Sequence, residues 1–388
     1  MSPDQALSIL TQGAAQIISE TELRDKLASG RPLRVKLGVD PTSPDIHLGH
    51  TVVLRKLRQF QELGHQAVLI IGDFTGMIGD PSGRSATRPH LTRDAVLANA
   101  ETYRDQAFKI LNSAQTETVF NGDWLRKMSY EDVIRLNSRV TLQQMLQRED
   151  FRARIDNQHA IHAHEIQYPI MQGWDSVMVK ADVELGGTDQ LFNILVGRDF
   201  QKEEGMSPQV VFLLPILEGL DGGKKMSKSL GNFVGISEPA ATMFGKLMSI
   251  SDELMAHYYS LLLGRQLPSG MHPVEAKKQL AFEIVQTYHS VSTARETLDD
   301  WNRRFSEKRL NDAALPEFKS RDGNAVTITV AAFAEAFGIT KSRAETSRLI
   351  KQGSVQLDGT KIVEPGASLS LQAGQILRLD KTHAVRVR

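Results

Sequence analysis

The sequence of 388 residues contains no cysteine. This excludes a disulfide framework, an iron–sulfur cluster, cysteine-ligated zinc and a cysteine nucleophile. Long apolar runs are also missing: the longest spans residues 210–217, is interrupted by Pro215, and is too short to cross a bilayer. The start, MSPDQALSIL, has neither a basic segment nor a long apolar one, so we expect no secretory signal. These absences predict a cytoplasmic protein without membrane contact.

An excess of charge of one sign is also missing, because 46 Lys and Arg balance 46 Asp and Glu. The balance is uneven along the chain. Residues 326–388 carry nine basic and five acidic side chains, or +4, so the remaining residues carry 37 against 41, or −4. A basic terminal module is compatible with a polyanionic partner. A solvated basic face is the alternative, and charge alone favours it.

The apolar pattern of the first 232 residues predicts an α/β fold. Residues 34–39 and 66–72 are near-continuous apolar strands separated by a helical pattern from His47 to Gly64, which is typical of a parallel βαβ unit. The alternation resumes with segments 182–185, 188–204 and 209–214, after a mostly helical insertion. Two such halves predict a doubly wound parallel sheet of the nucleotide-binding type.

The rest of the chain changes character twice. Residues 238–305 have helical periodicity, residues 310–325 are polar and turn-rich, and a helix at 341–352 precedes short strands with turns at Asp358-Gly359 and Pro365-Gly366. We therefore expect the following domains: a catalytic domain 1–232 with a helical insertion at about 85–180 and a loop at 221–232, an α-helical domain 233–318, and a linker with a small α+β domain 319–388.

The tetrad His47-Leu48-Gly49-His50 follows an apolar strand and a proline-containing turn. Two imidazoles three residues apart in the first turn of a helix project the same way, beside backbone N–H groups and the positive end of the helix dipole. This favours an anion site, where Gly49 lets a large ligand approach the backbone. Two surface histidines or a metal pair are the alternatives. The spacing disfavours a metal, since it is not that of zinc-binding helices and no adjacent glutamate supplies a base.

A second motif, Lys225-Met226-Ser227-Lys228-Ser229, follows a glycine-flanked turn about 175 residues downstream. Two lysines and two serines in such a loop supply mobile cations and hydroxyls suited to a triphosphate. A solvated basic loop is the alternative for this segment taken alone.

The two motifs, in this order on a doubly wound fold, resemble those of class I aminoacyl-tRNA synthetases. Three further segments narrow the resemblance to bacterial tyrosyl-tRNA synthetases, and it extends from about Leu33 to the C-terminus. These segments are Asp40-Pro41-Thr42, the run TGMIGDPSG that begins at Thr75, and Gly186-Gly187-Thr188-Asp189-Gln190. The glycine run matches neither a P-loop nor a dinucleotide-binding fingerprint.

The resemblance implies a tyrosine–tRNA ligase that makes tyrosyl-adenylate and pyrophosphate from tyrosine and ATP, then charges tRNA(Tyr). The implied catalytic residues, at the ATP phosphates, are His47, His50, Lys225 and Lys228. The implied ATP-binding residues are Asp40, Thr42, Gly49, Asp189, Met226 and Ser227. The implied tyrosine-binding residues are Lys36, Asp80, Tyr168, Gln172, Asp175 and Gln190. Mg²⁺ is expected to arrive with ATP, with no permanent cofactor and no protein metal site, and a homodimer is implied.

The amino-acid pocket also has a physical interpretation. Tyr168, Gln172 and Asp175 are spaced i, i+4 and i+7 and so share one helical face, where a carboxylate can accept a hydrogen bond from a phenol. A polar surface stripe is the alternative. Lys36 departs from the family pattern, in which many members have a tyrosine, and it can either pair with Asp175 or line the pocket.

Several other features have two interpretations each. His159, His162 and His164 lie close together, but a role outside metal binding is favoured. Arg84, Arg88 and Arg93 suit either nucleotide or tRNA contacts or a solvated loop. The three tryptophans are expected to pack in cores. Leu142, Met145 and Leu146 suit either a dimer interface or the core.

The C-terminal segment resembles the small RNA-binding fold named after ribosomal protein S-four. The residues implied to contact RNA are Lys341, Arg343, Arg348 and Lys351, with Leu349 and Ile350 in the core. Three alternative functions are a tryptophanyl enzyme, a small-molecule adenylyltransferase and a non-catalytic RNA-binding regulator. Asp175 and the RNA module count against a tryptophanyl enzyme. The lysine motif at Lys225–Ser229 and the RNA module count against an adenylyltransferase. The intact histidines and lysines count against a non-catalytic regulator.

Overall fold

The computed structural model describes residues 1–41, 45–82, 92–306, 315–318, 325–327, 343–365, 368–378 and 384–388. The chain forms two compact units, Met1–Ser290 and Val291–Arg388, and each is described by itself. The domain boundary expected at 232 falls inside the first unit. The boundaries at 232 and 318 stay predictions.

A six-stranded sheet forms the centre of the first unit, in the order β1–β6–β5–β2–β3–β4. Its strands are β1 (Gln16–Ile18), β2 (Arg34–Val39), β3 (Gln66–Ile71), β4 (Thr116–Phe120), β5 (Val183–Gly187) and β6 (Val210–Leu214). Strands β2 to β6 are parallel, and β1 pairs antiparallel with β6 at the edge. The strand order reverses between β2 and β5, which confirms the predicted doubly wound fold and defines its switch point.

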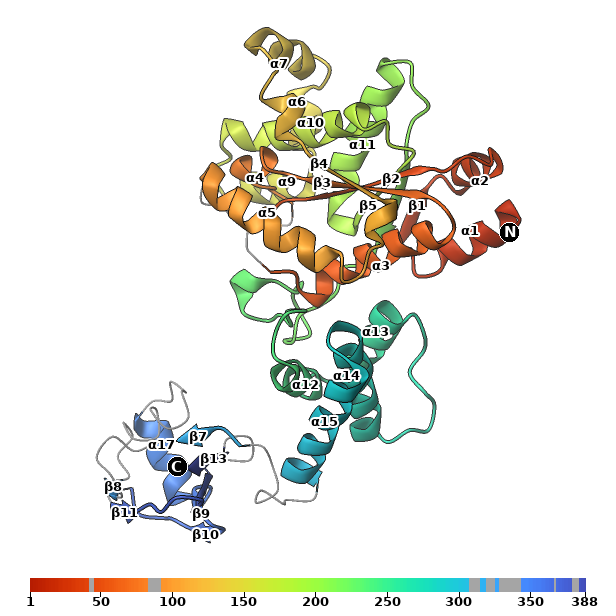
Figure 1. Ribbon diagram of the computed structural model, residues 1–388. Helices are drawn as coiled ribbons and strands as arrows, with labels where there is room; N and C mark the ends of the chain where they lie inside the picture. Colours follow the sequence, from red (N-terminus) through yellow and green to blue (C-terminus); the bar gives the residue numbers. More distant parts are fainter. Residues whose placement is uncertain are drawn as a thin grey trace. The chain divides into compact units, whose positions relative to one another are not determined.

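Helices cover both faces of this sheet. Figure 1 shows α10 and α11 on one face and α3 and α5 on the other. Because both faces are covered, every residue of β6 is buried, and its sequence is apolar without alternation. The helices of the unit are α1 (Pro3–Thr11), α2 (Glu20–Ala28), α3 (Leu48–Glu62), α4 (Thr75–Ile78), α5 (Arg93–Ala107), α6 (Gly122–Leu125), α7 (Tyr130–Asn137), α8 (Leu142–Leu146), α9 (Glu149–Asp156), α10 (Ala163–Met178), α11 (Leu191–Glu203), α12 (Ala240–Met248), α13 (Asp252–Leu263) and α14 (Pro273–Tyr288).

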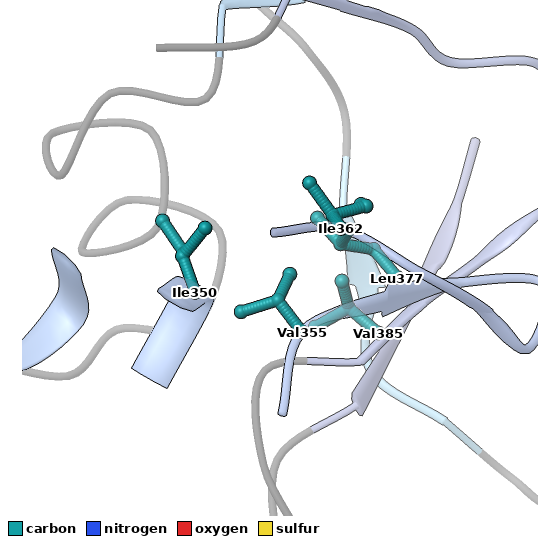
Figure 2. Close-up of a cluster of buried hydrophobic side chains, with 5 residues drawn as sticks. All are labelled: Ile350, Val355, Ile362, Leu377 and Val385. Carbon is teal, nitrogen blue, oxygen red and sulfur yellow. The ribbon is translucent and has the colours of Figure 1, made fainter. Parts of the chain in front are cut away.

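The second unit contains α15 (Val291–Trp301), the π-helical turn η4 (Asn302–Ser306) and α17 (Arg343–Lys351). Its larger sheet has the order β10–β9–β12–β13–β7, and β8 pairs with β11. The strands are β7 (Glu317–Phe318), β8 (Ala325–Thr327), β9 (Gln356–Leu357), β10 (Thr360–Lys361), β11 (Ser368–Ser370), β12 (Ile376–Arg378) and β13 (Ala384–Val387). Figure 2 shows the five buried side chains of its core, contributed by α17 and the segments after it.

Two predictions for the second unit, a hairpin turn and a linker, have different outcomes. The hairpin between β9 and β10 turns at Asp358 and Gly359, both with positive φ of 46° and 82°, as a two-residue hairpin requires. In contrast, the predicted linker 310–325 contains a strand. Glu317 and Phe318 pair in parallel with β13, and Phe318 packs on the core of this unit. The short, polar segment concealed this role because an edge strand of two residues has no periodicity to detect.

Candidate active site

A cavity of about 530 Å³ opens beyond the carboxyl ends of β2 and β5, at the switch point of the sheet. It brings most of the predicted site residues into one lining. These are Asp40, His47, Gly49, His50, Asp80, Tyr168, Gln172, Asp175, Asp189, Gln190, Lys225, Met226, Ser227 and Lys228. Thr42 lies outside the described residues.

Asp175 forms the buried end of the cavity. Its carboxylate accepts hydrogen bonds from Asn121 Nδ2 at 3.1 Å and Trp124 Nε1 at 2.9 Å. Burial raises the pKa of Asp175 to about 7, against the opposing effects of the Lys36 charge and these two hydrogen bonds. The sequence does not indicate Asn121 and predicts core packing for Trp124, because neither residue belongs to a motif with Asp175.

The stripe on α10 faces the cavity as its spacing predicts. Tyr168 donates from its hydroxyl to Asp40 Oδ2 at 2.9 Å, and Thr75 Oγ1 donates to Asp40 Oδ1 at 2.7 Å. A Cβ at position 72 would lie 2.0 Å from Asp40 Oδ1. Gly72 is therefore required for Asp40 to occupy this position. Asp40, expected only at ATP, is thus hydrogen-bonded to a predicted tyrosine-binding residue.

Amide side chains connect the remaining members of the pocket. Asn193 Nδ2 donates to Gln172 Oε1 at 3.0 Å and to Gln190 Oε1 at 3.1 Å, and Gln190 Nε2 donates to Asp80 Oδ2 at 2.9 Å. Arg148, between α8 and α9, donates to Asn193 Oδ1 at 2.5 Å. The sequence indicates neither Asn193 nor Arg148, because an isolated asparagine or arginine carries no motif.

The two histidines lie at the N-terminus of α3, with ring centroids 3.8 Å apart. His50 Nε2 is 3.0 Å from the Tyr103 hydroxyl, whereas His47 Nδ1 is buried without a hydrogen-bond partner. Burial lowers the pKa of His47 to about 2 and of His50 to about 4, and the lysine charges of the second motif act in the same direction. Both rings are therefore neutral at physiological pH. A Cβ at Gly49 would lie 3.0 Å from the His47 ring, so a larger residue fits here only where that ring shifts by a few tenths of an ångström.

The lysine motif lies on a loop between Leu217 and Asn232. The Asn232 side chain holds the loop by accepting from Ser227 N at 2.8 Å and donating to Asp221 at 3.1 Å. Lys225 Nζ is 3.1 Å from Asp189 Oδ2, and Lys228 Nζ is 2.7 Å from Asp45 Oδ2. Both cations are thus near the cavity and already paired with carboxylates.

Lys36 does not take the position expected of a tyrosine contact. Its side chain is fully buried, and Nζ lies 2.9 Å from Glu184 Oε1. Among the described residues, those that line the cavity do not include Lys36. The ion-pair partner of Lys36 is therefore Glu184, although the Lys36 charge also acts on Asp175, and the assignment of Lys36 to tyrosine binding stays a prediction. The actual partner, Glu184, is the neighbour of Lys36 on the adjacent strand.

The other candidates have varied placements. Arg93 is exposed at the start of α5, and Arg84 and Arg88 lie outside the described residues. Met145 is in a core cluster, whereas Leu142 is 58% exposed. The ring centroids of His162 and His164 are 5.8 Å apart, and no group of three or more metal-ligating side chains occurs within the described ranges.

The predicted RNA-binding residues lie in or near α17. Arg348 and Lys351 are exposed, Ile350 is buried and Leu349 packs on the same core. Arg343 begins α17, and Lys341 lies outside the described residues. Within the part of the chain that the structure describes, no helix has the length and apolarity needed to cross a membrane.

The doubly wound fold and the cavity with paired histidines and loop lysines define a class of nucleotide-using enzymes, and comparison with known proteins identifies it. The model of the family of class I tRNA synthetases for tryptophan and tyrosine matches residues 28–314, so the chain belongs to this family. A tyrosine–tRNA ligase of Oleidesulfovibrio alaskensis is 53% identical over 100% of this chain and 99% of its own. That of Moorella thermoacetica is 48% identical over 98% and 95%. Within the family, the chain groups with the bacterial tyrosine–tRNA ligases.

Solved structures of more distant proteins share the fold. The tyrosyl-tRNA synthetase of Aeropyrum pernix has a TM-score of 0.62 at 20% identity, and the match covers 77% of this chain and 98% of that one. That of Archaeoglobus fulgidus, solved in complex with L-tyrosine, has a TM-score of 0.61 at 21% identity, over 76% and 99%. At this identity the likeness concerns the fold alone.

Proposed function

We propose that this tyrosine–tRNA ligase uses the cavity at the switch point for both of its reactions, with tyrosine at the Asp175 end and ATP at the histidine and lysine end. The observation that carries the assignment is the single lining shared by a buried carboxylate and a group of cations and imidazoles. A phenol needs an acceptor, and a triphosphate needs donors and positive charge. One cavity supplies both.

In the first reaction, a tyrosine carboxylate oxygen forms a bond to the α-phosphorus of ATP. The bond from this phosphorus to the bridging oxygen of pyrophosphate breaks, and pyrophosphate leaves with that electron pair. His47 and His50 donate neutral N–H groups to phosphate oxygens, and Lys225 and Lys228 neutralise the charge that develops. No protein nucleophile takes part, so catalysis rests on positioning and charge stabilisation. Mg²⁺ arrives with ATP as part of the substrate.

The remaining residues bind and orient the two substrates. Asp175 accepts the phenol hydrogen bond, and the α-ammonium group is bound by Tyr168, Gln172, Asp80 and Gln190. The ATP contacts are assigned to Asp40, Thr42, Gly49, Asp189, Met226 and Ser227, with Asp189 at the ribose. In the second reaction, a ribose hydroxyl of the terminal adenosine of tRNA(Tyr) attacks the carbonyl carbon of tyrosyl-adenylate, and AMP leaves.

The test is ATP–pyrophosphate exchange with each of the twenty amino acids. Exchange with tyrosine alone, at a rate far above that with phenylalanine or tryptophan, is the expected result. Exchange dependent on tryptophan would assign the other member of the family pair. No exchange with any amino acid, in a protein that still binds tRNA, would support a non-catalytic regulator.

The second unit is proposed to bind tRNA through the exposed basic residues of α17. Its buried core is apolar, so Arg348 and Lys351 remain for phosphates. Because Phe318 packs on this core, a truncation that removes the core together with β7 ends at residue 314 and keeps α15 and η4 of the second unit. We expect such a chain to make tyrosyl-adenylate at close to the full-length rate but to charge tRNA poorly. The salt dependence of tRNA binding should flatten by about 0.7–0.9 per lost phosphate contact. A parallel loss of thermal stability and of both activities would contradict this role.

A cytoplasmic homodimer is proposed for the whole protein. Tyr130, Ile134 and Leu142, in the helical insertion, are large hydrophobic side chains that are 81%, 52% and 58% exposed in the single chain, and a subunit interface would cover such side chains. Sedimentation equilibrium of wild type and of Ile134→Asp tests this assignment. A dimer that the substitution dissociates is expected; an unchanged monomer would contradict it.

A further inference from the structure

A fully buried ion pair joins the two halves of the sheet at the switch point, beside the middle of α10. Lys36 on β2 and Glu184 on β5 are register partners in the parallel ladder at the switch point. Their side chains are 0% and 2% exposed, and Nζ lies 2.9 Å from Oε1. Isolated charges at this depth are costly, so such a pair needs further hydrogen bonds to be tolerated.

Those further bonds all lead to α10 or to the residue next to β6. Lys36 Nζ donates to the backbone carbonyl oxygen of Gln172 at 3.0 Å and to Ser176 Oγ at 2.7 Å. Ser176 Oγ donates in turn to Glu184 Oε2 at 2.9 Å, and Gln209 Nε2 donates to the same oxygen. The pair therefore holds the middle of α10, where the proposed tyrosine-binding stripe lies, against the switch point.

The side chain of Gln172 connects this pair to the cavity. Its Nε2 donates to Glu184 Oε1 at 3.3 Å, while its Oε1 accepts from Asn193 at 3.0 Å. The reverse orientation would place the amide oxygen against a carboxylate, with two acceptors facing each other. Glu184 thus fixes the Gln172 amide with its nitrogen toward the ion pair and its oxygen toward Asn193. An α-ammonium group has donors only, so an oxygen is the atom that it requires.

We propose that Lys36 and Glu184 form a positioning pair for tyrosine, which orients the Gln172 amide as an acceptor for the α-ammonium group and fixes α10 against β2 and β5. This inference rests on the proposed function, since it assumes that tyrosine occupies the Asp175 end. The Lys36 charge also opposes the rise in the pKa of Asp175, one turn further along α10. The pair touches neither substrate and acts through Gln172.

The test compares tyrosine with 3-(4-hydroxyphenyl)propionate, which is tyrosine without its ammonium group. The variant is the double substitution Lys36→Met with Glu184→Gln, which leaves no unpaired buried charge. We expect the dissociation constant of the propionate divided by that of tyrosine to fall by about tenfold in the variant, because tyrosine loses one hydrogen bond to its charged ammonium group. The KM for tyrosine should rise in parallel, with little change in the KM for ATP or in kcat.

The matched control is Arg154→Met with Glu165→Gln. That pair is as deeply buried, with side chains 2% and 3% exposed, and it lies at the start of the same helix. It should lower thermal stability without changing the ratio. An unchanged ratio in the Lys36/Glu184 variant, or an equal change in the control, would overturn the proposal and leave the pair a purely structural one.

Two further measurements keep the test decisive. If the double variant does not fold, Ser176→Ala is used, because it removes the hydrogen bonds of Ser176 Oγ while both charges stay paired. A shift of about twofold to threefold in the same ratio is then expected. No shift would overturn the proposal. If instead the wild-type protein does not distinguish the two ligands, the assignment of tyrosine to this cavity fails, and that outcome is separate from failure of the positioning pair.

Discussion

At the proposed tyrosine end of the cavity the polar groups are buried and already bonded to protein, whereas at the proposed nucleotide end the charged groups lie on a loop and are partly exposed. Asp175 and Tyr168 are 4% and 7% exposed. The side chains of Lys225 and Lys228 are 37% and 20% exposed, and their carboxylate partners 23% and 48%. Both ends are polar, but only one of them is fixed before any ligand arrives.

This difference has a physical consequence for each end. A buried acceptor that a ligand leaves unpaired costs binding free energy, so the tyrosine end can discriminate between amino acids. A partly exposed ion pair contributes little to stability, so Lys225 and Lys228 can exchange a carboxylate for a phosphate at small cost. The fixed end suits selection, and the exchangeable end suits a charge that changes during the reaction.

The largest expected effect comes from the exchangeable end. Lys225→Ala or Lys228→Ala should lower the rate of tyrosyl-adenylate formation by about a hundredfold or more, since each removes a donor to the developing charge. Ground-state affinity for ATP should change much less, because that charge is smaller before the reaction. Single-turnover kinetics and equilibrium ATP binding measure the two quantities separately.

Lys224→Ala is the matched control, because Lys224 is exposed and adjacent but does not line the cavity. It should leave both quantities near their wild-type values. Equal losses of rate and of affinity in the Lys225 or Lys228 variant would mean that the loop simply binds ATP, and the contrast between the two ends would weaken.

A smaller effect is expected at the fixed end. Asp175→Ala removes the proposed phenol acceptor, so preference for tyrosine over phenylalanine should fall by roughly tenfold to a hundredfold, which corresponds to about 1–3 kcal/mol for a buried polar group. Exchange kinetics with both amino acids give the ratio of kcat/KM values. Asp182→Ala serves as control. This buried carboxylate does not line the cavity and forms an ion pair with Arg31 at 2.5 Å, so its loss should reduce stability and leave selectivity intact. Unaltered selectivity in the Asp175 variant would refute the assignment.

The sequence is informative about the two ends to different degrees. Both signature motifs are local, and β2 has the predicted bounds 34–39 because an apolar run between a helix and a turn is readable along the chain. The hydrogen bonds of Asp175 depend instead on Asn121 and Trp124, more than 50 residues away. The partner of Lys36 depends on strand register, which the apolar runs of β2 and β5 leave undetermined. The edge strand β1 was also missed, since three residues offer no period.

The smallest effect concerns pH and separates the two ends without any substitution. Burial raises the pKa of Asp175 to about 7 and lowers those of His47 and His50 to about 2 and 4. A raised carboxyl pKa means that the ionised form, the better acceptor, is present above pH 7 and is lost as the pH falls through 7. Between pH 8 and pH 6 its fraction changes by about tenfold, and the preference for tyrosine over phenylalanine should fall by up to that factor. The histidines stay neutral over this range, so no inflection near their ordinary pKa of 6.5 is expected in the adenylation rate at saturating tyrosine.

Carbon-13 NMR of labelled aspartate, with the Asp175 signal assigned by its absence in Asp175→Asn, gives the carboxyl pKa directly. A selectivity that is constant from pH 6 to pH 8, with a carboxyl pKa near 4, would show that the fixed end is as solvated as the exchangeable one.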